Sequence, residues 1–386
     1  MQALRVLILF LLLPVLVQSQ DYETYVVPVS ISNDQDFTGY ELIDPDNSTL
    51  FVLAEHWHNI KSVPDATFKL LQYLHQKANV RIVAIEHGKS VAYMINEYLE
   101  SGDEVQLSHI TRNTMFWGKE NRVFFQALRK FNLSLPADQR ISVESIDIEY
   151  KQESAIFMIN KFIGDQSVPS SLDETVGTFQ RIYEETREHR ESYEGLSIMY
   201  YYDRELVEQL VIQTINDLED DSQKYIDFFG ENFSTFATMI LEMDDGLTFD
   251  YTNPNQHYRF RDRLIYKNFI ELVEAYPNTG ILCPIGMRHM MKNSSLSDLD
   301  IRPSSPLKDQ VTYIRVSSLF KKSLNAGDLK KINFNFPNQL KVNDATLIKH
   351  SDENNALKSA KGFDYTLFIN ENGSLTPFEN VLTEQY

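Results

Sequence analysis

The sequence of 386 residues predicts an α/β fold, in which a parallel-rich sheet is flanked by helices and carries a large all-helical insertion. Three observations support this prediction. Apolar strand patterns alternate with amphipathic helical patterns over residues 20–150, which is typical of a parallel sheet with helices on its faces. Strand patterns are absent over residues 151–275, where helical periodicity dominates. They return over residues 276–386, so we expect the sheet to be assembled from both ends of the chain.

The first part of the predicted core, residues 20–150, begins with an extended lead-in. Strands and helices then follow one another, and we expect them at 50–54, 64–78, 80–85, 90–100, 120–131 and 141–148. The strands are short apolar runs, whereas the helices repeat apolar residues at helical spacing. Pro64 suits the first turn of its helix, and Gly102 suits the end of the helix over 90–100.

Residues 151–275 form the predicted helical insertion or cap. Its clearest helix follows Asp203, a suitable N-cap, and its expected buried stripe contains Leu206, Val207, Leu210, Val211, Ile215 and Leu218. A last helix over 256–275 is expected to bury Phe260, Leu264, Phe269 and Leu272. The second part of the core, residues 276–386, supplies strands that we expect at 280–285, 311–316 and 364–369.

The amino terminus has the features of a secretory signal peptide. Arg5 precedes an apolar run from Val6 to Val17, and the segment ends on a small residue, Ser19. This order is typical of an export signal that is cleaved after Ser19. The apolar run is shorter than the roughly 20 residues that a membrane-spanning helix needs. We therefore expect a signal peptide over residues 1–19 and an extracytoplasmic protein, secreted or periplasmic, without a membrane span.

Composition and charge restrict the classes of partner. The formal net charge is −19 at pH 7, and such a chain repels the phosphates of nucleic acids and anionic membrane surfaces. The apolar content of 42% is sufficient for a packed core and argues against disorder. Cys283 is the single cysteine, so the core itself must stabilise the fold. We expect the partner to be a small-molecule or peptide substrate, and no nucleic acid.

Two of the predicted strands end on a glutamate. The apolar run over 50–54 leads into Glu55 and His58, and the run over 80–85 leads into Glu86. A strand–helix–strand unit makes its two strands parallel, so both glutamates emerge at the carboxyl edge of the sheet, where open α/β sheets bind ligands. Two carboxylates and an imidazole at that edge indicate a catalytic or metal site, because a carboxylate can orient a histidine as a general base.

Two later segments carry residues that suit such a site. Gly286 follows a predicted strand and lets the chain turn sharply, which would place His289 at the same sheet edge. Arg261, Asp262 and Asn268 lie on one predicted helix. Arg261 and Asp262 would form an exposed pair or brace the site, or Arg261 would hold a substrate carboxylate or oxyanion.

Together these segments resemble the superfamily that joins the erythromycin esterases, the Tiki proteases and the ChaN-type haem-binding lipoproteins. The segment Ala54-Glu55-His56-Trp57-His58-Asn59 is similar to the first motif of the family, Gly-Glu-x-x-His-Gly. Glu86 matches the second glutamate, and its position 28 residues after His58 agrees with the erythromycin esterase branch. The other matching positions are Trp117, Asp147, Arg261, Asp262, Asn268, Gly286 and His289.

The resemblance implies hydrolysis of an ester, lactone or amide. It makes His58 the base that activates water and makes Glu55 and Glu86 the groups that orient it. It also implies that His289 polarises the carbonyl or stabilises the oxyanion. The positions expected to bind substrate or to support the site are Arg261, Asp262, Asn268, Trp117, Asp147 and Gly286.

Three positions depart from the family pattern. Ala54 and Asn59 replace the two glycines of the first motif. Gly286 stands where the erythromycin esterases carry the first of two histidines, so that His289 alone remains there. These changes argue against a macrolide substrate and leave the general hydrolytic residues in place.

A metal-dependent hydrolase of the Tiki type is one alternative. His56 and His58 form a His-x-His pair at a strand end, and alternate residues of a strand point the same way. His257 or His289 would complete the ligand set of a divalent metal.

A non-catalytic protein that binds haem or another small ligand is the second alternative. Its ligand would contact the tyrosines at 200–202 and the methionines Met287, Met290 and Met291. A serine or cysteine hydrolase is not expected, because the Gly-x-Ser-x-Gly pattern is absent and Cys283 lies within an apolar strand. The favoured interpretation, a hydrolase that uses His-activated water, needs no cofactor.

Overall fold

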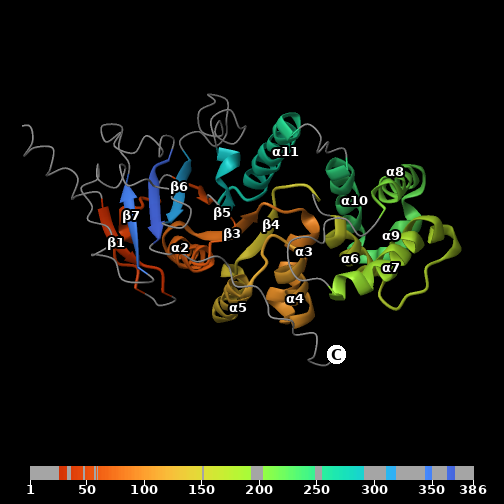
Figure 1. Ribbon diagram of the computed structural model, residues 1–386, viewed down its shortest axis with the longest axis horizontal. Helices are drawn as coiled ribbons and strands as arrows, with labels where there is room; N and C mark the ends of the chain where they lie inside the picture. Colours follow the sequence, from red (N-terminus) through yellow and green to blue (C-terminus); the bar gives the residue numbers. More distant parts are fainter. Residues whose placement is uncertain are drawn as a thin grey trace, which may run out of the picture.

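The computed structural model is built on a single sheet (Figure 1). It describes residues 26–32, 36–46, 48–55, 58, 60–149, 152–192, 203–247, 254–290, 310–318, 344–349 and 363–369. The strands are β1 (Val26–Ser30), β2 (Leu50–Glu55), β3 (Val80–Ile85), β4 (Ser142–Ser145), β5 (Gly280–Gly286), β6 (Val311–Ser318), β7 (Asp344–Lys349) and β8 (Tyr365–Ile369). Their order across the sheet is β1-β7-β8-β6-β2-β5-β3-β4.

The sheet is predominantly parallel, which confirms the predicted α/β class. Among the described strands only β7 runs in the opposite direction, and it pairs antiparallel with β1 and β8. β1 lies in the segment predicted as an extended lead-in, and β7 is not among the predicted strands. Both strands lie at the side of the sheet away from the glutamate-ended strands, so the difference does not affect the site.

β5 lies between the two glutamate-ended strands, β2 and β3. The two strands of the predicted strand–helix–strand unit are parallel but are not adjacent in the sheet. The chain returns to the sheet about 200 residues later and fills the space left between them, which is a long-range pairing that no local pattern encodes. As a result Gly286, at the end of β5, is level with Glu55, at the end of β2.

The helices are α2 (Val63–Ala78), α3 (Lys89–Ser101), α4 (Glu104–Asn113), α5 (Lys119–Ser134), α6 (Gln152–Ile163), α7 (Thr178–Ser192), α8 (Arg204–Asp221), α9 (Gln223–Phe229), α10 (Phe233–Leu247) and α11 (Pro254–Ala275). No helix in the described ranges combines the length and the apolar character needed to cross a bilayer.

Side chains alternate along the strands and give the sheet two apolar faces. On β2, Phe51 and Leu53 belong to the core shared with α2, α3 and α5, whereas Leu50 and Val52 belong to the core under α11. Figure 1 shows α11 on one side of the sheet and α2, α3 and α5 on the other. α11, which falls within the predicted helical insertion of residues 151–275, packs its buried Ile265 on the sheet.

Helices α6 to α10 pack together beyond the β4 end of the sheet, and α6 and α10 contact α3 (Figure 1). The expected N-cap of α8 is present, because the Asp203 carboxylate accepts from the backbone of Glu205 and Leu206. Val207 and Leu210 are buried as expected. Leu206 is 42% exposed, so the predicted stripe is one residue too wide.

Candidate active site

Four parallel strands end side by side at the carboxyl edge of the sheet. Glu55 is the last residue of β2, Gly286 ends β5, and Glu86 directly follows β3. Asp147 lies two residues beyond β4. Because the strands share one direction, polar residues from distant parts of the chain meet at this edge.

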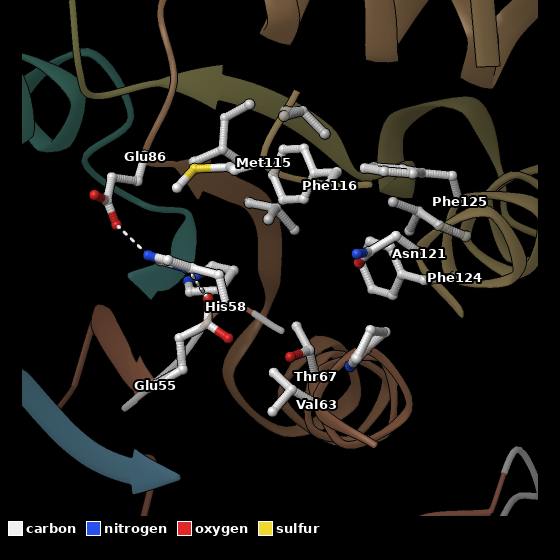
Figure 2. Close-up of a pocket in the computed structure, with 16 residues that line it drawn as sticks. Glu55, His58, Val63, Thr67, Glu86, Met115, Phe116, Asn121, Phe124 and Phe125 are labelled. Atoms are coloured by element: carbon white, nitrogen blue, oxygen red, sulfur yellow. Dashed lines mark hydrogen bonds and ion pairs between the residues drawn. The ribbon is translucent and has the colours of Figure 1, made fainter. Parts of the chain in front are cut away.

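The His58 ring stands between two carboxylates, as Figure 2 shows. Its Nδ1 lies 2.6 Å from Glu55 Oε1, and its Nε2 lies 3.8 Å from Glu86 Oε2. The short contact makes Nδ1 the protonated nitrogen beside Glu55, so that in the neutral ring Nε2 is the acceptor. The side chain of His58 is 37% exposed, so the ring is open to solvent.

The same carboxylates determine the charge of His58. Burial alone would lower the pKa of His58, but the negative charge of Glu55 and its hydrogen bond, together with Glu86, raise it to about 9. The resting ring is therefore predominantly protonated at neutral pH, as an imidazolium held by Glu55.

Glu86 is buried and accepts three hydrogen bonds. Arg261 Nη2 donates to Oε1 at 2.8 Å, His289 Nε2 lies 2.9 Å from the same oxygen, and the Gly286 N–H donates to Oε2 at 2.8 Å. Burial would raise the pKa of Glu86, but the positive charges of His289 and Arg261 outweigh it and hold that pKa well below its usual range. Glu86 is thus a fixed negative charge.

Arg261 joins the sheet edge to α11. Its Nε donates to both oxygens of Asp147, at 3.0 and 2.9 Å, and its Nη2 donates to Asp147 and to Glu86. A planar guanidinium suits this task because it can bind two carboxylates at once. Asp147 is oriented in turn by the Ile148 N–H, which donates to Oδ1 at 2.9 Å.

His289 lies behind Glu86 and not at the surface of the cavity. It sits on the turn η6 (Met287–Met290), is 3% exposed, and has its Nδ1 2.6 Å from Asp262 Oδ1. Burial would lower its pKa, but the charge of Glu86 and the hydrogen bond with Asp262 raise it to about 9. His289 is therefore a buried cation that holds Glu86.

Gly286 allows the two halves of the site to meet. A Cβ atom at this position would lie 3.0 Å from His58 Nε2 and 3.3 Å from Glu86 Oε2, closer than ordinary van der Waals contact. A side chain at the end of β5 would thus push His58 away from Glu86. The departure of Gly286 from the family pattern has a structural consequence here.

Two of the predicted supporting residues lie apart from this cluster. Asn268 Nδ2 donates to the Ile146 carbonyl at 3.1 Å, so it secures the segment after β4. Trp117 is half-buried, and its carbonyl accepts from Asn121 at 3.0 Å. The two residues before Trp117, Met115 and Phe116, line the cavity described next.

A cavity extends from His58 between α2 and α5, with strands β3 and β4 at its base (Figure 2). The space inside it that is open to the centre of a water molecule is about 50 Å³, and the whole hollow, with open solvent included, is about 690 Å³. Its lining, besides Glu55, His58 and Glu86, is Val63, Pro64, Thr67, Val83, Ile85, Met115, Phe116, Asn121, Phe124, Phe125, Leu128, Val143 and Pro284. The sequence does not identify these residues as cavity lining, because apolar periodicity marks a side chain as buried without showing that it borders a space.

The described side chains around Glu86 do not fit a divalent metal. Both ring nitrogens of His289 already contact carboxylates, and both oxygens of Glu86 already accept hydrogen bonds, Oε1 from Arg261 and Oε2 from the Gly286 N–H. Among the described residues no group of three or more His, Cys, Asp or Glu side chains is arranged to hold a metal ion. His56, one predicted ligand, lies outside the described residues, and the side chain of His257 is not described.

The haem alternative rests mainly on residues that the structure does not describe. Residues 200–202 and Met291 lie outside the described ranges. Met287 is buried in the turn that carries His289. The haem alternative stays a prediction.

Comparison with known proteins supports the fold. A protein from Bacillus cereus is 15% identical with a TM-score of 0.58, over 93% of this chain and 98% of its own. A mutant of the erythromycin esterase EreC in its open conformation is 13% identical with a TM-score of 0.58, over 93% of this chain and 100% of its own. A succinoglycan biosynthesis protein is 12% identical with a TM-score of 0.58, over 92% and 97%.

No protein-family model and no curated protein matches the sequence. At these identities the likeness to solved structures concerns the fold alone. The chain thus has an erythromycin esterase-like α/β fold, as the resemblance of its motifs implied.

Proposed function

We propose that this protein is a hydrolase in which water activated by His58 attacks an ester, lactone or amide. The observation that carries the proposal is the position of His58, which stands between Glu55 and Glu86 at the mouth of an apolar cavity. A carboxylate on Nδ1 and an accessible Nε2 are the requirements of a histidine base. The erythromycin esterase-like fold is consistent with such chemistry.

In the proposed reaction the neutral His58 ring takes a proton from water at Nε2 while the water oxygen bonds to the carbonyl carbon. Glu55 stabilises the imidazolium that forms, because it already accepts from Nδ1. The tetrahedral intermediate then expels its alcohol or amine, which receives the proton from Nε2 as the carbon–oxygen or carbon–nitrogen bond breaks. One water is consumed, and one acid and one alcohol or amine are formed.

Glu86 has a positioning role in this proposal. The 3.8 Å between His58 Nε2 and Glu86 Oε2 is too long for a hydrogen bond, and a water at this point could contact both atoms. Arg261 and His289 hold Glu86 in place, and neither of them is a lining residue of the cavity. We accordingly assign His289 to the support of Glu86, in place of the contact with the carbonyl oxygen that the resemblance implied.

We test the proposal with esters, lactones and peptide amides offered to the wild type and to His58→Ala. We expect His58→Ala to lose at least about 100-fold in kcat/KM, the usual contribution of a general base. His75→Ala is the matched control, because His75 bonds the Gln139 carbonyl at the surface of α2, away from the cavity. Activity that survives in His58→Ala would remove His58 from the mechanism, and activity lost only with a chelator would favour a metal-dependent hydrolase.

We also propose that the enzyme acts outside the cytoplasm. The support for this is the sequence of residues 1–19, which lies outside the described residues. Export would bring the site to substrates in the surroundings of the cell.

A further inference from the structure

The chemistry of the cavity beyond His58 is apolar and uncharged. Its far end is made by Phe124, Phe125 and Leu128, which are buried and belong to the main core. Among the described residues the lining includes no lysine or arginine, and its two acidic members, Glu55 and Glu86, lie beside His58. A carboxylate or phosphate in this space would lie in an apolar environment without a counter-charge, which is costly. The cavity therefore suits a neutral, apolar part of a substrate.

Two polar side chains interrupt this apolar lining. Asn121 on α5 is 7% exposed and Thr67 on α2 is 4% exposed, and both border the cavity. Figure 2 shows Thr67 beside Val63 and Asn121 beside Phe124. They lie on the two helices that form the cavity walls.

The free polar atoms of these two residues face the cavity. Asn121 Nδ2 donates to the Trp117 carbonyl at 3.0 Å, which fixes the orientation of the amide and leaves Oδ1 as an acceptor. Among the described residues neither this oxygen nor the Thr67 hydroxyl has a hydrogen-bond partner, and neither atom is fully buried. Polar atoms in such surroundings require a partner, which a bound molecule can supply.

We propose that the cavity binds an uncharged apolar acyl group that carries a hydroxyl, and that Asn121 and Thr67 recognise this hydroxyl. The inference rests on the proposed function, because it places the scissile carbonyl at His58 and the acyl chain between α2 and α5. Asn121 Oδ1 accepts from the substrate hydroxyl, and the Thr67 hydroxyl donates to it or accepts from it. The leaving alcohol or amine remains on the solvent side of His58.

An acyl group without the hydroxyl would bind less well. It would displace water from Asn121 Oδ1 and leave that acceptor unpaired in an apolar space. Sites that are built to hydrogen-bond a substrate hydroxyl discriminate strongly against analogues that lack it. We expect a preference of about tenfold or more in Kd for the hydroxylated group.

The test uses neutral amides that serve as binding probes and need not be hydrolysed. N-methylhexanamide is compared with its isomers hydroxylated at carbons 3 to 6, and N-methyl-3-phenylpropanamide with its 4-hydroxyphenyl analogue. Binding is measured by calorimetry on the wild type, on Asn121→Leu and on Thr67→Val. Both variants replace a polar side chain with an apolar one of similar size, and circular dichroism checks that each is folded.

In the wild type we expect at least one hydroxylated probe to bind about tenfold more tightly than its parent, and Asn121→Leu to abolish this preference. Equal binding of parent and hydroxylated probes would overturn the inference, as would a preference that survives in both variants. Absence of binding by every probe would overturn it as well. If the preference is found but the matching methyl esters are not hydrolysed, the proposed function fails and the recognition of the hydroxyl stands.

Discussion

Gly286 at the end of β5 lies level with Glu55 at the end of β2, and its lack of a side chain lets His58 approach Glu86. The relationship depends on β5 lying between the two glutamate-ended strands. Any other residue at this position would place its Cβ 3.0 Å from His58 Nε2 and 3.3 Å from Glu86 Oε2. The catalytic arrangement that we propose therefore depends on the order of the strands in the sheet.

The first prediction concerns Gly286→Ala. The added Cβ, 3.0 Å from His58 Nε2, should displace the ring by a few tenths of an ångström and lower kcat/KM by about tenfold, with little change in stability. Gly280→Ala at the other end of β5 is the control. There the Cβ would lie 2.6 Å from the Ala78 carbonyl, so it should lower the melting temperature and leave the activity of the folded protein intact. Full activity in Gly286→Ala would contradict the assignment.

The second prediction concerns the buried guanidinium of Arg261. Arg261→Met leaves Asp147 buried without its cation and Glu86 with His289 as its remaining cation, so it should lower the free energy of unfolding by about 3–5 kcal/mol in urea titrations. Arg181→Met is the matched control, because Arg181 pairs with Asp173 at the exposed surface and should contribute about 1 kcal/mol or less. A similar decrease in the free energy of unfolding in the two variants would show that the buried ion pairs of Arg261 do not stabilise the fold.

The third prediction concerns the pH dependence of activity. A base must be neutral, and the pKa of His58 is about 9, so kcat/KM should rise by about tenfold per pH unit from neutral pH and level off near pH 9. Glu55→Gln removes the charge that raises this pKa, so its profile should level off at a lower pH, with a lower plateau. A rate that falls through pH 9 would instead identify protonated His58 as the active form.

The fourth prediction concerns the pH dependence of stability. The pKa of His289 is raised from 6.5 to about 9 on folding, so its contribution is complete below pH 6.5 and is lost as the pH rises through 9. The pKa of Glu86 is lowered, so its contribution is complete above pH 4.5 and is lost at lower pH. The ion pair of His289 and Glu86 should therefore stabilise the fold most between pH 4.5 and pH 6.5.

His289→Asn provides the measurement. The difference in the free energy of unfolding between wild type and variant should shrink by about 3 kcal/mol from pH 6 to pH 10. A difference that is constant over this range would show that the charge on His289 does not stabilise Glu86.

The fifth prediction concerns export. Expression of the full chain in a secreting host should deliver a protein whose first residue is Gln20, as measured by amino-terminal sequencing of the extracellular fraction. Replacement of Leu11 and Leu12 by arginine interrupts the apolar run and should retain the chain inside the cell. Secretion of this variant, or an intact Met1 in the secreted protein, would contradict a cleaved signal peptide.

The sequence was sufficient to predict the strands that carry Glu55 and Glu86 and the edge at which they end. Apolar runs and helical periodicity identify buried faces, and a strand–helix–strand unit has one direction only, so both glutamates had to emerge together. The same logic brought His289 to this edge. These inferences needed no knowledge of which strands are neighbours.

The tertiary structure decided how these residues face one another. The pairing of β5 between β2 and β3 depends on contacts over about 200 residues of chain. This pairing places Gly286 beside His58 and Glu86, where a side chain would be too close to both. Packing of α11 on the sheet brings Arg261 to Glu86 and keeps His289 behind it. The cavity with Thr67 and Asn121 exists because α2 and α5 pack side by side over the sheet. A local pattern records which face of an element is buried, whereas long-range packing determines what that face meets.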